Sequence, residues 1–409
     1  MSASEEAERK HRSLILPGGR VDPDAVRLAI GGDEQDATVD EADDGGESEG
    51  LCRVTFKLSR DLDKRLDKYL TDRISFMSRS QLQRLIDEGG VSVNGRGAKA
   101  SQKLRLNDVV EVALPPPPST EIQPEAIPLE ILYEDDALIV VNKQPDLIVH
   151  PARSHLKGTL LNALVHHFRG GGPGLSSVGK EFARPGVVHR LDRRTSGVMV
   201  VAKDDQAHWK LGRQFENRAV DKRYLAIVHG LIEPDVDVID VPLGPSVSRV
   251  KGLREKQQVR HDELGKPAVT IYRVRQRLAL SGSAMTLVEL ELKTGRTHQI
   301  RVHLAHLGYP LVGDDMYGGR HVDPASIGAD PLGGTAGVFD RQALHAAVLG
   351  FRHPLTGAAV RFTAPLPEDM MALLRRARRA SGDPPIVEVP GATVDLMEAA
   401  PPEPRGAAS

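Results

Sequence analysis

The chain is poor in cysteine and in aromatic residues, and it lacks long apolar runs. Cys52 is the only cysteine among 409 residues, which excludes an intrachain disulfide and a Cys/His zinc spacing. No apolar run approaches the ~20 residues needed to span a bilayer. The first fifty residues lack the apolar core of a signal peptide, and their many acids do not suit a transit peptide. The sequence therefore predicts a cytoplasmic protein without a membrane span.

Common catalytic signatures are also missing. There is no Gly-x-Ser-x-Gly, no Walker A loop and no His-Glu-x-x-His motif. His189, His298 and His303 suggest a metal site only weakly, because His298 and His303 are five residues apart rather than the four that place two ligands on one helix face. The glycines of 170–174 lack the strand-then-helix setting of a dinucleotide-binding loop. We therefore expect neither a metal nor a cofactor.

Charge is distributed unevenly along the chain, although the formal net charge is only −2. Residues 1–50 hold 5 basic and 14 acidic residues, and residues 381–409 hold 1 and 5. Residues 51–380 therefore hold 48 basic and 37 acidic residues, a net charge of +11. A basic body between acidic ends is typical of a protein that binds nucleic acid. An ordinary solvated surface with an uneven charge count is the alternative.

Composition divides the chain into five parts. The ends have too few large apolar residues to form a core, and four consecutive prolines stiffen a linker between two compact units. The predicted parts are a disordered acidic extension at 1–52, a small module at 53–113, a Pro-rich linker at 114–126, a larger unit at 127–380 and a disordered tail at 381–409.

The small module is expected to hold two helices and at least two strands. Its first helix would carry Leu62, Leu66, Tyr69 and Leu70 on one face, and a second would begin near Ser80. The strands are expected at 91–95, with an Asn-Gly turn, and at 109–112. Six basic side chains lie off the apolar faces: Lys64, Arg65, Lys68, Arg73, Arg79 and Arg84. They could contact phosphates or could be ordinary solvated helix faces.

The larger unit is predicted to be α+β, with a mixed, largely antiparallel sheet. Strands outnumber helices and do not strictly alternate with them. The expected strands are 137–141, 198–202, 224–228, 270–274, 287–292, 346–349 and 359–362. The expected helices are 159–168, 205–216, 297–307 and 368–379. The stretches 170–174, 244–266 and 320–340 are predicted to be surface loops.

Two segments carry the chemistry. Asp192 lies in a charged turn, within 186–197, between an apolar lead-in and the apolar run 198–202, so its side chain could line a cleft at the rim of the sheet. The segment 294–303 supplies cations that would favour an ionised carboxylate, which can act as a nucleophile. The alternative is an aspartate that caps a turn through Thr195 and Ser196.

These residues resemble a known family. His189–Asp192 with Thr195–Gly197 is similar to the signature of the RluA/RluD-type RNA pseudouridine synthases. Further motifs agree, in the expected order, over residues 53–380. In the larger unit they are 142–151, 158–164, 222–226, 295–301 and 313–314; in the small module, which resembles an S4 RNA-binding domain, they are 65–67, 78–79 and 91–95.

The resemblance implies isomerisation of uridine in folded RNA without a cofactor or a metal. It assigns the catalytic aspartate to Asp192, the tyrosine that packs against the base to Tyr224, and the arginine that pairs with that aspartate to Arg301. Arg190 would help to hold the flipped-out nucleotide, whose extrusion costs roughly a few kcal/mol. Whether Asp192 attacks the sugar or removes a proton from it stays open. In the S4-like module, Arg65, Arg79 and Arg84 are the candidate RNA contacts.

The chain departs from the family at two places. Asp146 stands where the family usually has glycine, and the preceding proline is displaced by one position, which leaves the shape of that loop open. The acidic extension and the stretches 244–266 and 320–340 have no assigned counterpart.

The arrangement of an S4 module before a synthase unit suggests, by analogy, large-subunit ribosomal RNA as the partner, with transfer RNA as the alternative. A monomer is the default expectation. Two rival classes remain: a non-catalytic RNA-binding or ribosome-assembly protein, and a carboxylate-dependent hydrolase of nucleic acid. The second would need another paired acid or a metal cluster, which the sequence does not offer.

Overall fold

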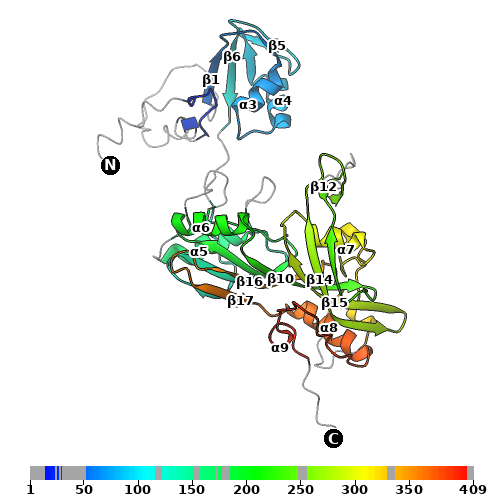
Figure 1. Ribbon diagram of the computed structural model, residues 1–409. Helices are drawn as coiled ribbons and strands as arrows, with labels where there is room; N and C mark the ends of the chain where they lie inside the picture. The colour runs from blue at the N-terminus through cyan, green and yellow to red at the C-terminus, as the bar shows by residue number, and fades with distance from the viewer. Residues whose placement is uncertain are drawn as a thin grey trace. The chain divides into compact units, whose positions relative to one another are not determined.

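The computed structural model describes residues 14–23, 25–26, 29, 52–115, 122–150, 157–170, 174–176, 185–246, 256–328 and 337–402. They form two compact units, Met1–Ser119 and Thr120–Ser409 (Figure 1). Each unit is described by itself. The acidic stretch 31–51 and residues 116–121 of the predicted linker lie outside the described residues.

The first unit is a small four-stranded sheet with two helices. Its strand order is β1-β6-β3-β4, and a separate antiparallel pair joins β2 to β5. The strands are β1 (Cys52–Lys57), β2 (Leu62–Arg65), β3 (Val91–Val93), β4 (Arg96–Gly97), β5 (Lys103–Leu104) and β6 (Val109–Leu114). The helices are α3 (Leu66–Arg73) and α4 (Arg79–Asp87).

The predicted start of the first helix is wrong, because Leu62 lies in β2. Leu62 pairs with Leu104 of β5, and the helix begins only at Leu66. The apolar spacing of Leu66, Tyr69 and Leu70 does face the core of the unit. The second helix agrees with the prediction: Ser78 and Gln81 form a reciprocal capping box that fixes its start.

The described part of the N-terminal extension packs on this unit, so the prediction of disorder is wrong there. Val21 and Val26 are buried in the same core as α3. The backbone N–H of Val21 donates to the carbonyl of Arg73 at 2.8 Å, and Nη1 of Arg73 donates to the carbonyl of Gly18 at 2.8 Å. Residues of the N-terminal extension therefore belong to the core of the small unit, although the predicted module began only at residue 53.

The second unit is built on a nine-stranded sheet. The order is β11-β14-β15-β10-β16-β9-β8-β7, and β17 pairs with β16. Among the described strands of this sheet, β16 and β9 are the one parallel pair, which confirms the prediction of a mixed, largely antiparallel α+β unit. The strands are β7 (Glu130–Glu134), β8 (Leu138–Lys143), β9 (Ser196–Ala202), β10 (Asp221–His229), β11 (Val236–Asp240), β14 (Val269–Leu280), β15 (Ser283–Leu292), β16 (Leu344–Arg352) and β17 (Ala359–Thr363).

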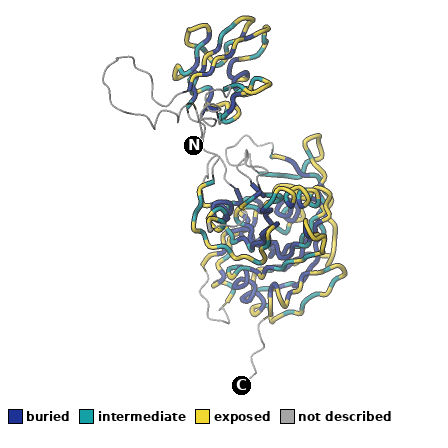
Figure 2. Tube along the Cα trace, turned by 90° about the vertical axis from the view of Figure 1, so that its left-hand side faces the viewer, coloured by how far each residue is buried: buried dark blue, intermediate teal, exposed yellow. Residues whose placement is uncertain are grey.

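Helices cover both faces of this sheet. Side chains alternate along a strand, so Met199 and Val201 of β9 face one core, and Val200 faces another. The helices α5 (Leu160–His167) and α7 (Gln299–His306) pack against the core that contains Met199. The helices α6 (Asp205–Glu216) and α8 (Glu368–Ala380) cover the other face of the sheet. Figure 2 shows the buried segments running through the interior of the unit. No helix in the described ranges is long and apolar enough to cross a membrane.

The predicted loops 244–266 and 320–340 contain short ordered elements. Within the first, β12 (Leu243–Pro245) pairs with β13 (Gln257–Val259). In the second, Pro324–Ser326 forms a 3₁₀ turn, and Val322 bridges Phe339. The segments 247–255 and 329–336 lie outside the described residues.

The prediction of a disordered tail at 381–409 is wrong for residues 381–402. This segment carries α9 (Leu396–Ala399), and Val394, Leu396 and Ala399 are buried against α8. Its carbonyls accept hydrogen bonds from buried arginines, including Nη1 of Arg275 to Val394 at 2.9 Å. A Pro- and Ala-rich sequence gives little periodic signal, so these contacts were not visible in it.

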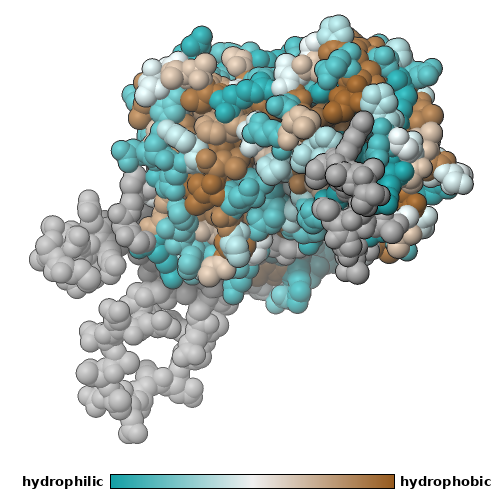
Figure 3. Space-filling model, turned by 90° about the horizontal axis from the view of Figure 1, so that it is seen from below, coloured by the Kyte–Doolittle hydropathy of each residue, from teal (hydrophilic) through white to brown (hydrophobic). Residues whose placement is uncertain are grey.

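Seen from below, the surface carries patches of apolar side chains separated by hydrophilic ones (Figure 3).

Candidate active site

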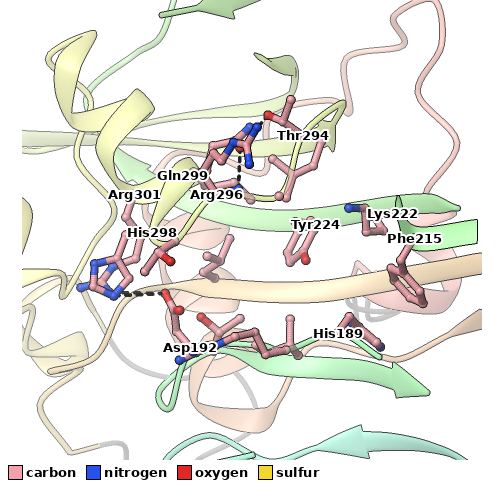
Figure 4. A pocket seen from close by; sticks show the side chains of 18 of the residues that line it. His189, Asp192, Phe215, Lys222, Tyr224, Thr294, Arg296, His298, Gln299 and Arg301 are labelled. Carbon is pink, nitrogen blue, oxygen red and sulfur yellow. Dashed lines mark hydrogen bonds and ion pairs between the residues drawn. The ribbon is translucent and has the colours of Figure 1, made fainter. Parts of the chain in front are cut away.

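A cavity of about 420 Å³ opens where the Asp192 turn, β10 and the β15–α7 loop meet. It is within the size range of small-molecule pockets. Figure 4 shows its side chains converging from these elements. Among the lining residues are all four catalytic-unit residues singled out from the sequence: Arg190, Asp192, Tyr224 and Arg301. The geometry therefore brings together segments more than a hundred positions apart.

The turn that carries Asp192 precedes β9 directly. The apolar lead-in to this turn carries an isolated bridge between Val187 and Val201. The backbone N–H of Thr195 donates to the carbonyl of Asp192 at 3.0 Å and closes the turn. Gly197, the second residue of β9, has φ +117, and a Cβ there would lie 2.2 Å from the carbonyl oxygen of Ala346. Only glycine fits this close approach, so the start of β9 is fixed beside β16.

The side chain of Asp192 points towards Arg301 and His298 rather than capping its own turn. Nη1 of Arg301 lies 3.4 Å from its Oδ2, and Nε2 of His298 lies 3.8 Å from the same oxygen. The carboxylate is partly exposed to the cavity. Within the described residues no hydrogen bond links it to Thr195 or Ser196. The alternative of a purely local cap is therefore not supported.

Arg301 is held by a second carboxylate. Its Nε and Nη2 donate to the two oxygens of Asp314 at 2.7 Å each, a bidentate pair that is almost fully buried. Burial alone would lower the pKa of Arg301, but the hydrogen bonds and charge of Asp314, followed by the charge of Asp192, raise it. A buried guanidinium in this position stays charged and presents one edge to Asp192.

His298 and Tyr317 lie beside Arg301 on the same wall of the cavity. Nδ1 of His298 lies 2.8 Å from the hydroxyl of Tyr317, and the guanidinium of Arg301 lies 4.9 Å from the centre of that ring. His298 adopts a left-handed φ of 56 as the N-cap of α7. Burial outweighs the charge of Asp192 and lowers the pKa of His298. The ring is therefore a neutral hydrogen-bonding group near neutral pH.

Tyr224 forms the floor of the cavity on β10. It is only 9% exposed, and burial together with the charge of Asp192 raises its pKa, so the phenol stays protonated. A flat, buried aromatic face suits contact with a base. Arg190 lines the same cavity but is exposed. Its side chain is therefore free to approach a ligand from the solvent side.

The loop that contains Asp146 contacts the turn that carries Asp192. Nζ of the buried Lys143 donates to the carbonyls of Gln144, Leu147 and Arg193, the last at 3.1 Å. Burial, reinforced by nearby Arg341, lowers the pKa of Lys143 to about 7. The lysine thereby ties the 143–147 loop to the residue that follows Asp192.

Asp146 itself has φ 62, in the left-handed region where glycine is normally preferred. The structure thus keeps the loop geometry that a glycine would allow. The Asp146 carboxylate lies 3.5 Å from Arg194 and 3.9 Å from Arg193. Asp146 therefore places a negative charge beside the turn that carries Asp192.

A metal-binding group is not evident. Among the described residues no set of three or more His, Cys, Asp or Glu side chains could hold a metal ion. His303 points into the interior, where Thr270 and the carbonyl of Val241 contact its two ring nitrogens. His189 stacks on Phe215 with ring centres 4.5 Å apart, and burial together with Lys222 lowers its pKa to about 3. Both are structural histidines.

In the first unit, a buried acid brings two of the three predicted arginines together. Asp67 is fully buried and accepts hydrogen bonds from Arg65 at 3.1 Å and from Arg79 at 2.7 Å. Burial by itself would raise the pKa of Asp67, but these bonds and one from Gln83 lower it well below its usual range. Arg65 and Arg79 remain about half exposed. Arg84 stands apart, because it pairs with Glu88 one helical turn away at 2.6 Å.

Sequence reasoning did not assign roles to several of these residues. Asp314 was visible only as part of a motif, and its contact with Arg301 spans 13 positions. His298 was named as part of the 295–301 motif and as a weak candidate metal ligand, without a role beside Asp192. Tyr317, Asp67 and Lys143 act through contacts that no local pattern encodes, although a charged residue at the end of an apolar run, such as Lys143 at the end of β8, is a usable signal.

Comparison with known proteins agrees with this geometry. A family model described as RNA pseudouridylate synthase matches residues 137–306, and the S4 domain model matches residues 64–110. The chain is 43% identical over 316 residues to the RNA pseudouridine synthase YlyB of Bacillus subtilis, covering 77% of this chain and 95% of that protein. It is 41% identical over 319 residues to ribosomal large subunit pseudouridine synthase D of Zymomonas mobilis, covering 76% and 93%.

A further ribosomal large subunit pseudouridine synthase D, from Xylella fastidiosa, is 41% identical over 332 residues and covers 81% of this chain and 94% of that protein. Such identity over nearly the whole length of the relatives exceeds what a shared fold alone would give. The predicted S4 module, synthase unit and enzyme class are thereby confirmed. The chain belongs to the RluA/RluD-type family of RNA pseudouridine synthases that carry an N-terminal S4 domain.

Proposed function

We propose that this enzyme isomerises uridines of large-subunit ribosomal RNA in the cytoplasm, with Asp192 as the catalytic residue. The observation that carries the assignment of Asp192 is its position in the cavity, 3.4 Å from a charged arginine that is itself anchored by Asp314. The names of two of the relatives described above support the choice of ribosomal RNA. Transfer RNA is the alternative substrate.

The reaction breaks the bond between N1 of uracil and C1′ of ribose and forms a bond between C5 and C1′; C5 loses its hydrogen as a proton and N1 takes up a proton, so the product is an isomer of the substrate. The uridine must leave the helix for its C1′ to approach a protein carboxylate. In this proposal Asp192 reaches the sugar, and Arg301 keeps the aspartate ionised. Attack at C1′ and removal of a sugar proton both require this ionised carboxylate.

The other residues have supporting roles in the proposal. Tyr224 packs against the detached uracil and limits its movement while it rotates. Arg190, exposed at the rim, occupies the space that the extruded nucleotide leaves or grips a phosphate. In the S4 domain, Arg65 and Arg79 contact the RNA backbone, and Arg84 contributes less because Glu88 neutralises it. No step in this scheme uses a metal.

The test is to map pseudouridine in ribosomal and transfer RNA from a strain that lacks the protein. We expect specific sites in large-subunit ribosomal RNA to lose the modification, and the wild-type gene to restore them. Restoration by the wild type but not by Asp192→Asn supports the enzyme over a non-catalytic RNA-binding protein. Loss of pseudouridine from transfer RNA alone would contradict the substrate assignment, and unchanged maps in both RNAs would contradict the function.

A further inference from the structure

The cavity has a second end, beyond Tyr224, that the proposed chemistry does not use. Lys222 lines it together with Phe215 and Arg218, and Figure 4 shows Tyr224 between Lys222 and the Asp192–Arg301 pair. A Cβ added at Gly295 would lie 3.7 Å from Nζ of Lys222, so the amine rests against the loop between β15 and α7. Lys222 is thus a half-buried cation beside the place proposed for the target base.

Successive side chains of β10 point to opposite faces of the sheet, which explains why this lysine has no acidic partner among the described residues. Asp221 and Arg223, on either side of Lys222, point to the opposite face of the sheet. There, Arg223 pairs with both Asp221 and Glu291 at 2.7 Å. Lys222 shares the face of Tyr224 and is excluded from that network. Among the described residues it forms no ion pair; the exposed Glu216 lines the same end of the cavity without pairing with it.

The electrostatics of this end favour an anionic ligand. Burial, helped by the positive charge of Arg218, lowers the pKa of Lys222. The ammonium form therefore lacks the compensation that a bound anion would give. Uracil and ribose are neutral, so the anions nearest to an extruded nucleotide are its own backbone phosphates.

We propose that Lys222, assisted by Arg218, forms an anion subsite that binds the backbone phosphate adjoining the target uridine. This inference rests on the proposed function, because it takes RNA as the ligand of the cavity. The contact would hold one side of the flipped nucleotide while Tyr224 contacts the base and Asp192 faces the sugar. Its contribution would be to positioning and affinity, not to bond breaking.

The experiment uses the full chain and the shortest ribosomal RNA fragment that the wild type modifies. Binding is followed by fluorescence anisotropy of the labelled RNA over a range of KCl concentrations. Lys222→Gln is expected to weaken binding about tenfold and to reduce the slope of log K against log salt by about 0.7 to 0.9, the loss of one phosphate contact. Lys222→Arg, which keeps the charge, should retain most of the affinity. Lys210→Gln removes an exposed cation of α6 outside the cavity and is the matched control.

A second arm places a neutral methylphosphonate at the linkage on either side of the target uridine. At one of the two positions, the neutral linkage should weaken binding by the wild type and have no further effect on Lys222→Gln, since both changes remove the same contact. Additive losses at both positions, or equal effects of Lys222→Gln and Lys210→Gln, would overturn the subsite. If the wild type itself forms no pseudouridine in any ribosomal RNA fragment, it is the proposed function that fails.

The turnover of Lys222→Gln separates this role from a structural one. With saturating RNA its kcat should stay within about threefold of the wild type while KM rises about tenfold. A large fall in kcat at unchanged KM would mean that the substitution disturbs Tyr224 instead, and the phosphate contact would be refuted.

Discussion

Arg301 contacts Asp192 through a single nitrogen, Nη1 to Oδ2 at 3.4 Å, although its guanidinium is almost completely buried beside it. The two shorter contacts of the same guanidinium, at 2.7 Å, go to Asp314. Arg301 is therefore held more tightly by Asp314 than by Asp192. This arrangement fixes the position of a positive charge next to Asp192 while leaving the aspartate accessible from the cavity.

The first prediction concerns Asp314. Asp314→Asn removes the buried negative charge that compensates Arg301, so we expect the free energy of unfolding to fall by about 3 kcal/mol. We also expect kcat to fall at least about tenfold with a smaller change in KM, measured by pseudouridine formation and urea unfolding. The control is Asp315→Asn, an exposed neighbour. Equal effects of the two substitutions would show that Asp314 has no special role.

The second prediction separates the arginines of the S4 domain. Arg65→Gln and Arg79→Gln should each weaken RNA binding several-fold and lower its salt dependence, since both side chains are gathered by Asp67 yet half exposed. Arg84→Gln should have the smallest effect, because Glu88 already compensates its charge. The measurement is RNA affinity as a function of salt. A dominant effect of Arg84→Gln would refute this reading of the domain.

Much of the fold could be predicted from the sequence because local patterns control it. The helix at Asp205–Glu216 has an N-cap at Asp204 and buries Ala207 and Leu211 at helical spacing, and the structure places it at the predicted positions. The wrong predictions lie where long-range contacts decide. Leu62 joins a strand because Leu104 pairs with it, and residues 381–402 are ordered because buried Arg275 and Arg378 need their carbonyls.

The candidate site was predictable only in part, for the same reason. Asp192, Tyr224 and Arg301 lie in motifs that resemble a family, so each could be named from its own segment. Asp314 and His298 owe their roles to neighbours that the fold brings close, and no spacing in the sequence reports a contact such as His298 to Tyr317. The charge pattern predicted a nucleic-acid partner, but it could not show which basic side chains pair with acids in the fold and which are left to contact RNA.

The third prediction concerns the loop that departs from the family. Asp146 has a left-handed φ of 62, a conformation that costs an ordinary side chain about 1 to 2 kcal/mol and costs glycine almost nothing. Asp146→Ala should therefore be less stable than Asp146→Gly by about 1 kcal/mol, measured by urea unfolding. Both should keep activity, because the contacts of Asp146 with Arg193 and Arg194 are long and exposed. Equal stability of the two variants would contradict the assigned backbone conformation.

The fourth prediction is a pH dependence of stability. His345 is fully buried between the hydroxyl of Ser196 and the carbonyl of Ala364, and burial lowers its pKa to about 4. The unfolded chain, with an ordinary histidine pKa near 6.5, then takes up the proton first. The contribution of this group is complete above about pH 6.5 and is lost as the pH falls towards 4.

Urea unfolding at pH 7.5 and pH 5.0 tests this. Between these pH values, His345→Gln should lose less unfolding free energy than the wild type, by about 1 to 2 kcal/mol. The exposed His306 is the control, and His306→Gln should follow the wild type. A wild-type pH dependence that His345→Gln reproduces in full would rule out this linkage.

The most direct test of the account is the single-turnover rate of Asp192→Asn on the ribosomal RNA fragment that the wild type modifies. The substitution keeps the size of the side chain and removes the charge that faces Arg301. We predict a rate at least about a thousandfold lower, with the RNA dissociation constant within about threefold of the wild type. Pseudouridine formation at a rate close to the wild type would contradict the central claim that Asp192 carries the reaction.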